Sequence, residues 1–260
     1  MSSPTLSSVT NALRILKAFS AGEATLGVSD LARRLGIAKS TTHRLLTTLT
    51  AEGFVRHFPG GQYGLGLTLW ELGSLMVHEL DLREIAHPIL EELRNQTGET
   101  VNLAILDGTD VVYIDRFEAP TALPLLRRLG HRMPAHATSS GKALLAYASP
   151  DVVENVLKNG LRPLAAGTIT QMSDFIARLE QIRHRGWVVS VEESQPGIAS
   201  AGAPIFDQNG QAAGAVSVAG PLARMPAPSL ETTALQVRNA ADRISRGLGF
   251  VPPAHRPQAG

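Results

Sequence analysis

The sequence predicts an α+β protein of two domains, in which a small helical domain precedes a larger domain built on an antiparallel sheet. Apolar residues recur at helical spacing along the first 80 residues, whereas β-rich runs, turns and amphipathic helices follow from residue 82 onward. A chain of 260 residues is also longer than one small domain usually is. The expected parts are a disordered segment 1–8, a helical domain 9–66, a linker helix 67–81, a mixed domain 82–250 and a flexible tail 251–260.

The segment from Ser29 to Glu52 has the spacing of two helices joined by a tight turn. Its leucines form two short helical periods, and Gly36 between them can adopt the left-handed conformation that ends the first helix. Ser29 stands where the N-cap of that helix is expected, and the second helix is expected to begin near Lys39. This layout is typical of a helix-turn-helix.

The segments on either side supply the rest of a small module. Strand-like runs at 54–57 and 62–65 surround a turn-rich tip at 58–61, which predicts a hairpin, called the wing below. Together with a preceding helix, the wing makes the segment a winged helix-turn-helix. The preceding helix is expected to build the core with Val9, Ala12, Leu13, Leu16 and Phe19.

The second helix carries hydrogen-bond donors on the side away from its leucines, and such side chains reach phosphate oxygens and base edges in a DNA groove. The net charge is only +1, but residues 33–56 hold five basic residues against the single acid Glu52. An ordinary helical hairpin with a solvated basic side is the alternative, and the wing favours DNA binding. The predicted DNA-binding residues are Lys39, Ser40, Thr41, His43, Arg44 and Arg56.

The linker helix is apolar around much of its circumference, with leucines, Trp70 and Met76 on several sides. Such a helix needs partners on more than one side. It could pack between two domains of one chain, but an exposed tryptophan and methionine stripe also suits contacts with a second copy, which we favour.

The mixed domain is expected to form an antiparallel sheet with helices packed on it. Turns at 107–110 and 207–210 separate strand-like runs and predict two hairpins. The predicted helices are 82–97, 141–148, 151–159, 173–184 and 229–248, and the predicted strands are 101–106, 111–118, 187–192, 201–206 and 212–218.

Several separated motifs resemble one family. The runs LARRLGIAKSTTHRLLTTLTAEGFV and YGLGLTLWELG resemble the N-terminal winged helix of IclR-type bacterial transcriptional regulators. The runs RMPAHATSSGKALLA, HRGWVVSVEES and GIASAGAPIFDQNGQAAGAVSVAGP are similar to the effector-binding domain of that family. The resemblance implies a GAF-like, or profilin-like, α/β sensor domain and a homodimer or dimer of dimers on operator DNA. Repressors and activators use the same parts, so the sign of regulation is left open.

The resemblance also implies an effector pocket, whose apolar walls and hydroxyl groups suit a small organic acid or a hydroxylated aromatic. The predicted helix start at 139–141 offers free backbone N–H groups to an anion. Serines that only cap helices or satisfy backbone groups are the alternative. Ser190 and Ser200 stand where some relatives carry an aspartate or a cysteine, so the ligand of those relatives is not assumed. The implied lining is Ala122, Leu125, Met133, Ser139, Ser140, Ser190, Ser200, Ser217 and Ala219.

Other classes of site are weakly supported or excluded. The absence of cysteine excludes disulfides, thiolate metal sites and cysteine nucleophiles. The spacing of His131 and His136 is too scattered for a zinc site, so no metal is expected. Gly141-Lys142 resembles half of a P-loop, but the hydroxyl residue and the first glycine of that motif are missing, so no nucleotide or other cofactor is expected. No signal peptide or membrane-spanning run is seen, so we expect a cytoplasmic protein without a membrane partner.

The sequence leaves two alternative functions open. Ser139 and Lys142 have the Ser-x-x-Lys spacing of a serine hydrolase, in which case the basic N-terminal module would contact protein. The Lys-Thr-Gly and Ser-Asp-Asn motifs of such enzymes do not follow, so we do not expect an enzyme. The other alternative is a DNA-bridging protein that responds to no ligand.

Overall fold

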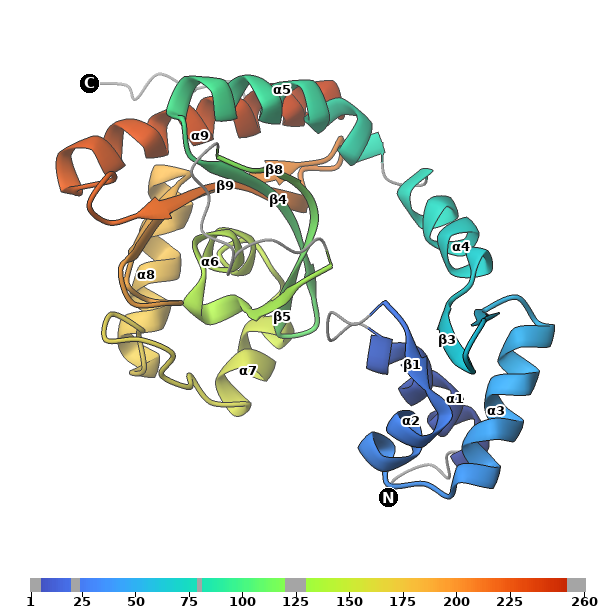
Figure 1. The fold of residues 1–260 in the computed structure, drawn as a ribbon. Helices are drawn as coiled ribbons and strands as arrows, with labels where there is room; N and C mark the ends of the chain where they lie inside the picture. The colour runs from blue at the N-terminus through green and yellow to red at the C-terminus, as the bar shows by residue number, and fades with distance from the viewer. Residues whose placement is uncertain (1–5, 20–23, 79–80, 120–129, 252–260) are drawn as a thin grey trace, which may run out of the picture. The chain divides into compact units, whose positions relative to one another are not determined.

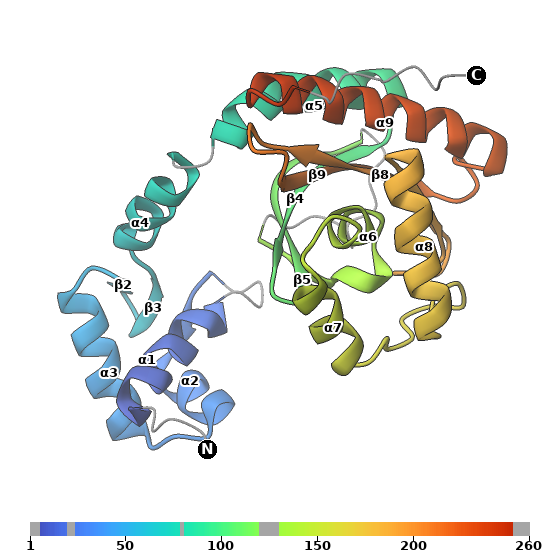
Figure 2. The same ribbon diagram turned by 180° about the vertical axis from the view of Figure 1, so that it is seen from behind.

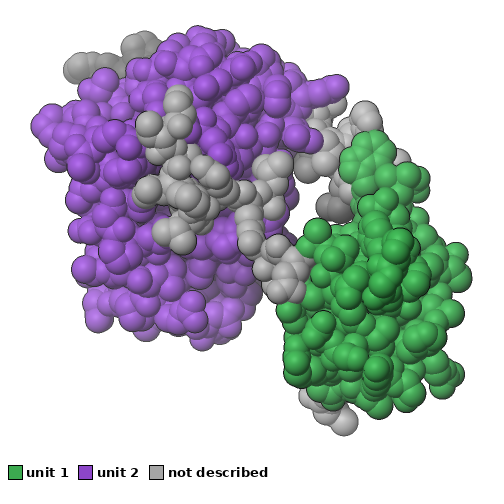
Figure 3. Space-filling model, viewed as in Figure 1, with its two compact units in different colours: residues 1–80 green, residues 81–260 purple. Residues whose placement is uncertain are grey.

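The computed structural model describes residues 6–19, 24–78, 81–119 and 130–251. The chain divides into two compact units, residues 1–80 and 81–260 (Figure 3). This division places most of the predicted linker helix in the first unit. Of the predicted disordered ends, residues 1–5 and 252–260 lie outside the described residues, whereas Ser7 and Ser8 belong to the first helix.

The first unit has the predicted arrangement of three helices and a hairpin (Figure 1). Gly36 has φ +67° and ends the first helix of the pair, as expected, and its N–H donates to the carbonyl of Ala32. A short sheet of order β1-β3-β2 closes the unit. Its elements are α1 (Ser7–Ala18), β1 (Leu26–Gly27), α2 (Val28–Leu35), α3 (Lys39–Ala51), β2 (Val55–Phe58), β3 (Gln62–Leu65) and α4 (Leu67–His78).

Two details of the first unit differ from the prediction. Helix α2 begins at Val28 with Gly27 as its N-cap, so Ser29 lies inside the first turn, because β1 pairs with β3 and runs directly into the helix. Helix α1 buries Ile15 completely, whereas Val9 and Leu13 are 53% and 52% exposed. The predicted core side of α1 is therefore partly wrong: its periodicity is helical, but Val9 and Leu13 lie on a side that this unit does not cover.

The second unit contains one antiparallel sheet of order β6-β5-β4-β9-β8-β7. Helices α5 and α9 cover one side of the sheet, and the sheet curls around α6 on the other side, with α7 and α8 nearby (Figures 1 and 2). The elements are α5 (Asp81–Thr97), β4 (Thr100–Asp107), β5 (Asp110–Phe117), β6 (Arg132–Pro134), a 3-10 helix η3 (Ala135–Ala137), α6 (Ser139–Leu145), α7 (Pro150–Lys158), α8 (Met172–Arg185), β7 (Val188–Val191), β8 (Ile198–Phe206), β9 (Ala212–Pro221) and α9 (Ala227–Gly247).

This architecture confirms the α+β class and both predicted hairpins. In the second hairpin, Asp207 and Gln211 close the turn with a 2.9 Å backbone hydrogen bond, and Gly210 has φ +75°. The predicted helices and strands are present with shifted ends. The two shortest strands, β1 and β6, were not predicted, because runs of two and three residues show no periodicity.

Helix α6 is the centre of the second unit, since all seven of its residues are buried. Two glycines allow this close packing. A Cβ on Gly141 would lie 2.1 Å from the carbonyl oxygen of Ala135, and one on Gly202 of β8 would lie 2.8 Å from the backbone of Ser139. The start of α6 therefore rests directly on β8. Among the described helices, none combines the length and the apolar composition that crossing a bilayer requires.

Candidate functional site

Helix α3 is the second helix of the predicted helix-turn-helix. Its buried side holds Thr42 and Leu46, and the hydroxyl of Thr42 donates to the carbonyl of Ala38. The hydroxyls of Thr47 and Thr48 donate to carbonyls one turn earlier in the helix. The basic side chains of the helix, which are exposed to solvent, lie in its first turns. The structure brings five of the predicted residues together on the exposed side of this helix, namely Lys39, Ser40, Thr41, His43 and Arg44. Contact of these residues with DNA stays a prediction.

Arg56 lies on the wing and is exposed. Its Nε donates a 3.2 Å hydrogen bond to the carbonyl of Leu65, and its guanidinium lies 5.2 Å from the centre of the Phe58 ring. Both contacts hold the side chain along the hairpin. A positive charge is therefore fixed on the wing, which is suited to a phosphate backbone, and this contact also stays a prediction.

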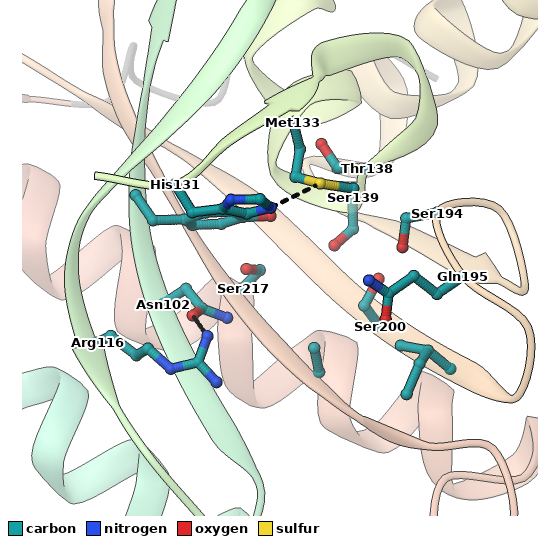
Figure 4. A pocket seen from close by; sticks show the side chains of 13 residues that line it. Asn102, Arg116, His131, Met133, Thr138, Ser139, Ser194, Gln195, Ser200 and Ser217 are labelled. Carbon is teal, nitrogen blue, oxygen red and sulfur yellow. Dashed lines mark hydrogen bonds between the residues drawn. The ribbon is translucent and has the colours of Figure 1, made fainter. Parts of the chain in front are cut away.

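The second candidate site is a pocket on the inner side of the sheet (Figure 4). Paired residues on neighbouring strands share a side, so the strand register decides which side chains meet there. One row runs from β5 through β4 and β9 to β8, and a second row runs from β9 through β8 to β7. The first row is Arg116, Asn102, Ser217 and Gly202, and the second is Ala219, Ser200 and Ser190.

A β-bulge in β5 adds Tyr113 to the first row's side of the sheet. Leu103 pairs with Asp115 and Ala104 pairs with Tyr113, which leaves Ile114 as an extra residue in β5. Tyr113 and Arg116 therefore both line the pocket although they are three positions apart. Regular alternation would have placed these two side chains on opposite sides.

The pocket is a hollow that is partly open to solvent. Five of the nine residues implied by the family resemblance line it, namely Met133, Ser139, Ser200, Ser217 and Ala219. Ala122 and Leu125 lie outside the described residues. The lining residues that the sequence did not reveal are Asn102, Tyr113, Arg116, His131, Thr138, Ser194, Gln195 and Ile198.

Ser140 and Ser190 are not among the residues that line this pocket. Ser140 Oγ donates a 2.9 Å hydrogen bond to Ser217 Oγ, and both serines are buried. Ser190 is the partner of Ser200 across β7 and β8, and its hydroxyl is buried without a hydrogen-bond partner in the described part of the chain. Both serines are buried next to residues of the lining, and their role in effector binding stays a prediction.

The positive charge in the wall is Arg116. Its side chain is only 7% exposed, its Nη1 donates a 3.2 Å hydrogen bond to Asn102 Oδ1, and its Nε lies 3.6 Å from Glu118 Oε1. Burial raises the pKa of Tyr113 to about 12, although a hydrogen bond with Ser140 acts in the opposite direction. At neutral pH the pocket therefore presents a cation, an uncharged phenol and several hydroxyl groups.

The start of α6 differs from the expected anion site. Thr138 is the N-cap, and its Oγ1 accepts a 3.0 Å hydrogen bond from the N–H of Gly141. One of the N–H groups that was expected to be free is therefore already occupied, and a helix of seven residues has a weak dipole. The positive charge of Arg116 lies in the same lining.

Lys142 does not act in the way the Ser-x-x-Lys spacing suggested. Its Nζ donates to Glu193 Oε1, and both side chains are buried. Burial lowers the pKa of Lys142 to about 8, and the carboxylate of Glu193 opposes this shift only in part. The ammonium group of Lys142 is therefore paired with the carboxylate of Glu193.

The two histidines considered for zinc have other contacts. His136 is buried and its Nε2 donates a 3.0 Å hydrogen bond to the carbonyl of Arg162, while Nε2 of His131 lies 3.1 Å from the sulfur of Met133. No group of three or more histidines, aspartates and glutamates placed to hold a metal ion occurs within the described ranges.

Comparison with known proteins assigns both units. Residues 8–59 match the IclR helix-turn-helix domain family, and residues 74–246 match the family of bacterial transcriptional regulator IclR C-terminal domains. The glycerol operon regulatory protein of Streptomyces griseus is 36% identical over 252 residues, which are 94% of this chain and 97% of that protein. The transcriptional repressor IclR of Escherichia coli K12 is 32% identical, over 93% of this chain and 90% of its own. These relatives are transcriptional regulators and not enzymes.

Solved structures agree with this assignment. An IclR homolog from Microbacterium hydrocarbonoxydans, complexed with 4-hydroxybenzoate, has a TM-score of 0.83 at 30% identity and covers 93% of this chain and 99% of its own. The Thermotoga maritima IclR structure has a TM-score of 0.77 at 33% identity, with coverage of 93% and 98%. Similarity over nearly the whole length therefore extends to both the helix-turn-helix and the pocket domain.

Proposed function

Because the chain belongs to the IclR family of bacterial transcriptional regulators, we propose that it binds operator DNA as an oligomer and that a small organic acid in the pocket alters this binding. Membership of the family shows the general class of protein, a regulator with a DNA-binding helix-turn-helix and an effector-binding domain. The oligomer, the effector class and the residues that bind each ligand are the parts we propose.

The observation that carries the effector class is the arginine in the pocket wall. The Arg116 guanidinium is 7% exposed and already contacts Glu118 and Asn102, and a carboxylate in the pocket would add short, charge-assisted hydrogen bonds to it. Tyr113 and the serines suit a second polar group such as a hydroxyl. The complex of the Microbacterium hydrocarbonoxydans homolog with 4-hydroxybenzoate supports this proposal, since that compound carries both groups.

For DNA binding, α3 is the element placed in the major groove and the wing contacts the adjacent backbone. Lys39 and Arg44 lie on the exposed side of α3, and Arg56 holds a charge on the wing. A two-fold related pair of such helices reads half-sites about one turn of DNA apart, roughly 34 Å.

The oligomer is supported by exposed apolar side chains in the first unit. Trp70 on α4 is 69% exposed and Leu67 is 63% exposed, while Val9 and Leu13 extend from α1. Monomeric proteins rarely leave so many large apolar residues in contact with water, and a second copy of the chain would cover them. We propose a homodimer or a dimer of dimers on this basis.

Regulation requires that the effector bind one arrangement of the oligomer more tightly than another, since equal affinity for both would shift nothing. We propose that the favoured arrangement changes the spacing of the two α3 helices. Operator affinity then changes with effector concentration.

The effector proposal is tested with matched pairs of ligands. A thermal-shift screen compares aromatic and aliphatic carboxylates, including 4-hydroxybenzoate, with their uncharged amides such as 4-hydroxybenzamide. We expect at least one acid to raise the melting temperature while its amide does not. Equal shifts for acids and amides would refute the role of Arg116, and no shift with any compound would favour a DNA-bridging protein without a ligand.

A further inference from the structure

We infer that Glu193 is a positioning residue of the effector pocket, because its carboxylate anchors the β7–β8 loop to helix α6 and so fixes the wall formed by Ser194 and Gln195. The inference rests on the proposed effector site. It assigns a role to the buried Lys142–Glu193 pair, which touches neither of the proposed ligands.

The loop at 192–197 forms one side of the pocket. Ser194 and Gln195 both line the space, and Ile198 follows at the start of β8 (Figure 4). Ser139, at the start of α6, lines it as well. The loop and α6 are therefore two adjoining walls whose separation decides the shape of the site.

The ion pair joins these two walls. Glu193 comes from the loop and Lys142 from α6, and their side chains are 6% and 0% exposed. The residue after Glu193 already faces the ligand space, so a displacement of the carboxylate would move Ser194 with it. Glu193 Oε2 has no hydrogen-bond partner in the part of the chain that the structure describes, so the pair is the carboxylate's main interaction there.

A stability role explains this pair poorly. Removing two charges from water is unfavourable for each ion, and apolar residues of similar volume often stabilise a core equally well or better. The pKa of Lys142, lowered by burial, shows that the attraction to Glu193 offsets this cost only in part. An interaction that stabilises little, yet fixes a direction and a distance, is suited to positioning.

Hydrogen bonds also hold the backbone around Glu193. The carbonyl of Glu193 accepts a 2.6 Å hydrogen bond from Thr168 Oγ1, and the carbonyl of Glu192 accepts one of 2.9 Å from the N–H of Gly167. Glu192 itself has φ +50°, a strained value for a residue with a side chain, and its Oε1 accepts from the N–H of Gly197 at 2.7 Å. The loop is thus a preformed wall, and the ion pair attaches it to α6.

The test combines hydrogen exchange with ligand binding in the full-length protein. Glu193→Gln keeps the size of the side chain and removes its charge. We expect exchange of the amides at 192–197 without ligand to accelerate about tenfold more than exchange in α9, while the first unit is unchanged, and we expect the Kd for 4-hydroxybenzoate to rise about tenfold. The control is Glu154→Gln, which removes an exposed ion pair with Lys158 in the same unit and should change neither quantity.

A double variant separates positioning from stability. Lys142→Met/Glu193→Leu replaces the ion pair by apolar side chains, and we expect it to recover the melting temperature but not the protection of the loop or the ligand affinity. If Glu193→Gln exchanges like the parent at 192–197, or if the double variant recovers both loop protection and affinity, the inference is wrong. If the parent does not bind 4-hydroxybenzoate, that effector is excluded, and the exchange of the ligand-free loop still decides the inference.

Discussion

Arg116 and Asn102 face each other across β5 and β4, and the guanidinium donates a 3.2 Å hydrogen bond to the amide oxygen. The contact fixes the guanidinium beside Asn102 within the pocket wall. Ser217, the next residue in the same row, is also in the lining. An acid bound in this pocket would therefore meet an arginine that is already oriented.

Arg116→Gln is expected to weaken binding of the effector acid by about 2 kcal/mol, roughly thirtyfold in Kd, because a charge-assisted hydrogen bond becomes a neutral one. Operator binding without effector should not change. Isothermal titration calorimetry measures the first quantity and fluorescence anisotropy the second. The control is Arg132→Gln, which removes an exposed arginine that pairs with Asp107 on the same sheet. Unchanged acid affinity in Arg116→Gln would place the carboxylate elsewhere.

Arg44→Ala is expected to weaken operator binding at least tenfold and to leave the melting temperature within about 1 °C, because an exposed arginine has little packing to lose. The slope of log K against log salt should fall by about one if Arg44 contacts a phosphate. Anisotropy titrations over a range of salt concentrations measure both effects. Lys158→Ala in the second unit is the control, and operator affinity equal to the parent's in Arg44→Ala would refute the assignment of α3.

Gly202→Ala is expected to destabilise the second unit by about 1–3 kcal/mol, because the added Cβ would lie 2.8 Å from the backbone of Ser139 and would push α6 away from β8. Urea denaturation measures the change. Gly27→Ala is the comparison without a clash, since its Cβ would meet Gln62 at an ordinary 3.4 Å; because Gly27 is the N-cap of α2, we expect only the cost of a poorer cap, about 0.5–1 kcal/mol. A stable Gly202→Ala protein with unaltered ligand affinity would contradict the close packing of α6 on the sheet.

The stability of the second unit should rise with pH between about 8 and 10. The pKa of Lys142 is lowered to about 8 in the folded protein, so over this range the unfolded chain holds a proton that the folded protein has lost, and the free energy of unfolding increases. Above pH 10 the trend should reverse, because burial raises the pKa of Tyr113 to about 12 and the unfolded chain ionises first. Urea denaturation from pH 7 to 11 measures both slopes.

Two variants check the assignment of these slopes. Lys142→Met should flatten the rise below pH 10, and Tyr113→Phe should weaken the fall above it. A rise that persists unchanged in Lys142→Met would assign it to another group.

The order of helices and strands could be predicted from the sequence because it depends on local patterns. Gly36 ends α2 through its own backbone conformation, and the turn residues at 107–110 and 207–210 determine the hairpins. Predictions from local patterns were wrong where contacts with distant parts of the sequence determined the structure. The pairing of β1 with β3 moved the start of α2 from Ser29 to Val28, and the uncovered side of α1 left Leu13 in water.

The pocket was less predictable, because its side chains come from strands that are distant in the sequence. Arg116 faces inward only through the bulge at Ile114, and no turn residue or motif marks that bulge. Asn102 lies opposite Arg116 because of the register between β4 and β5, and neither strand's sequence determines that register alone. The family resemblance supplied Ser139, Ser200 and Ser217 but not the arginine, which gives the site its charge.

The measurement that tests the account most directly is operator affinity with and without a carboxylate effector, compared among the parent, Arg44→Ala and Arg116→Gln. The account predicts that the acid changes operator affinity in the parent, that Arg44→Ala binds operator weakly under all conditions, and that Arg116→Gln binds operator like the parent but does not respond at the parent's effector concentrations. A full response in Arg116→Gln, or identical operator binding with and without every acid that the parent binds, would contradict it.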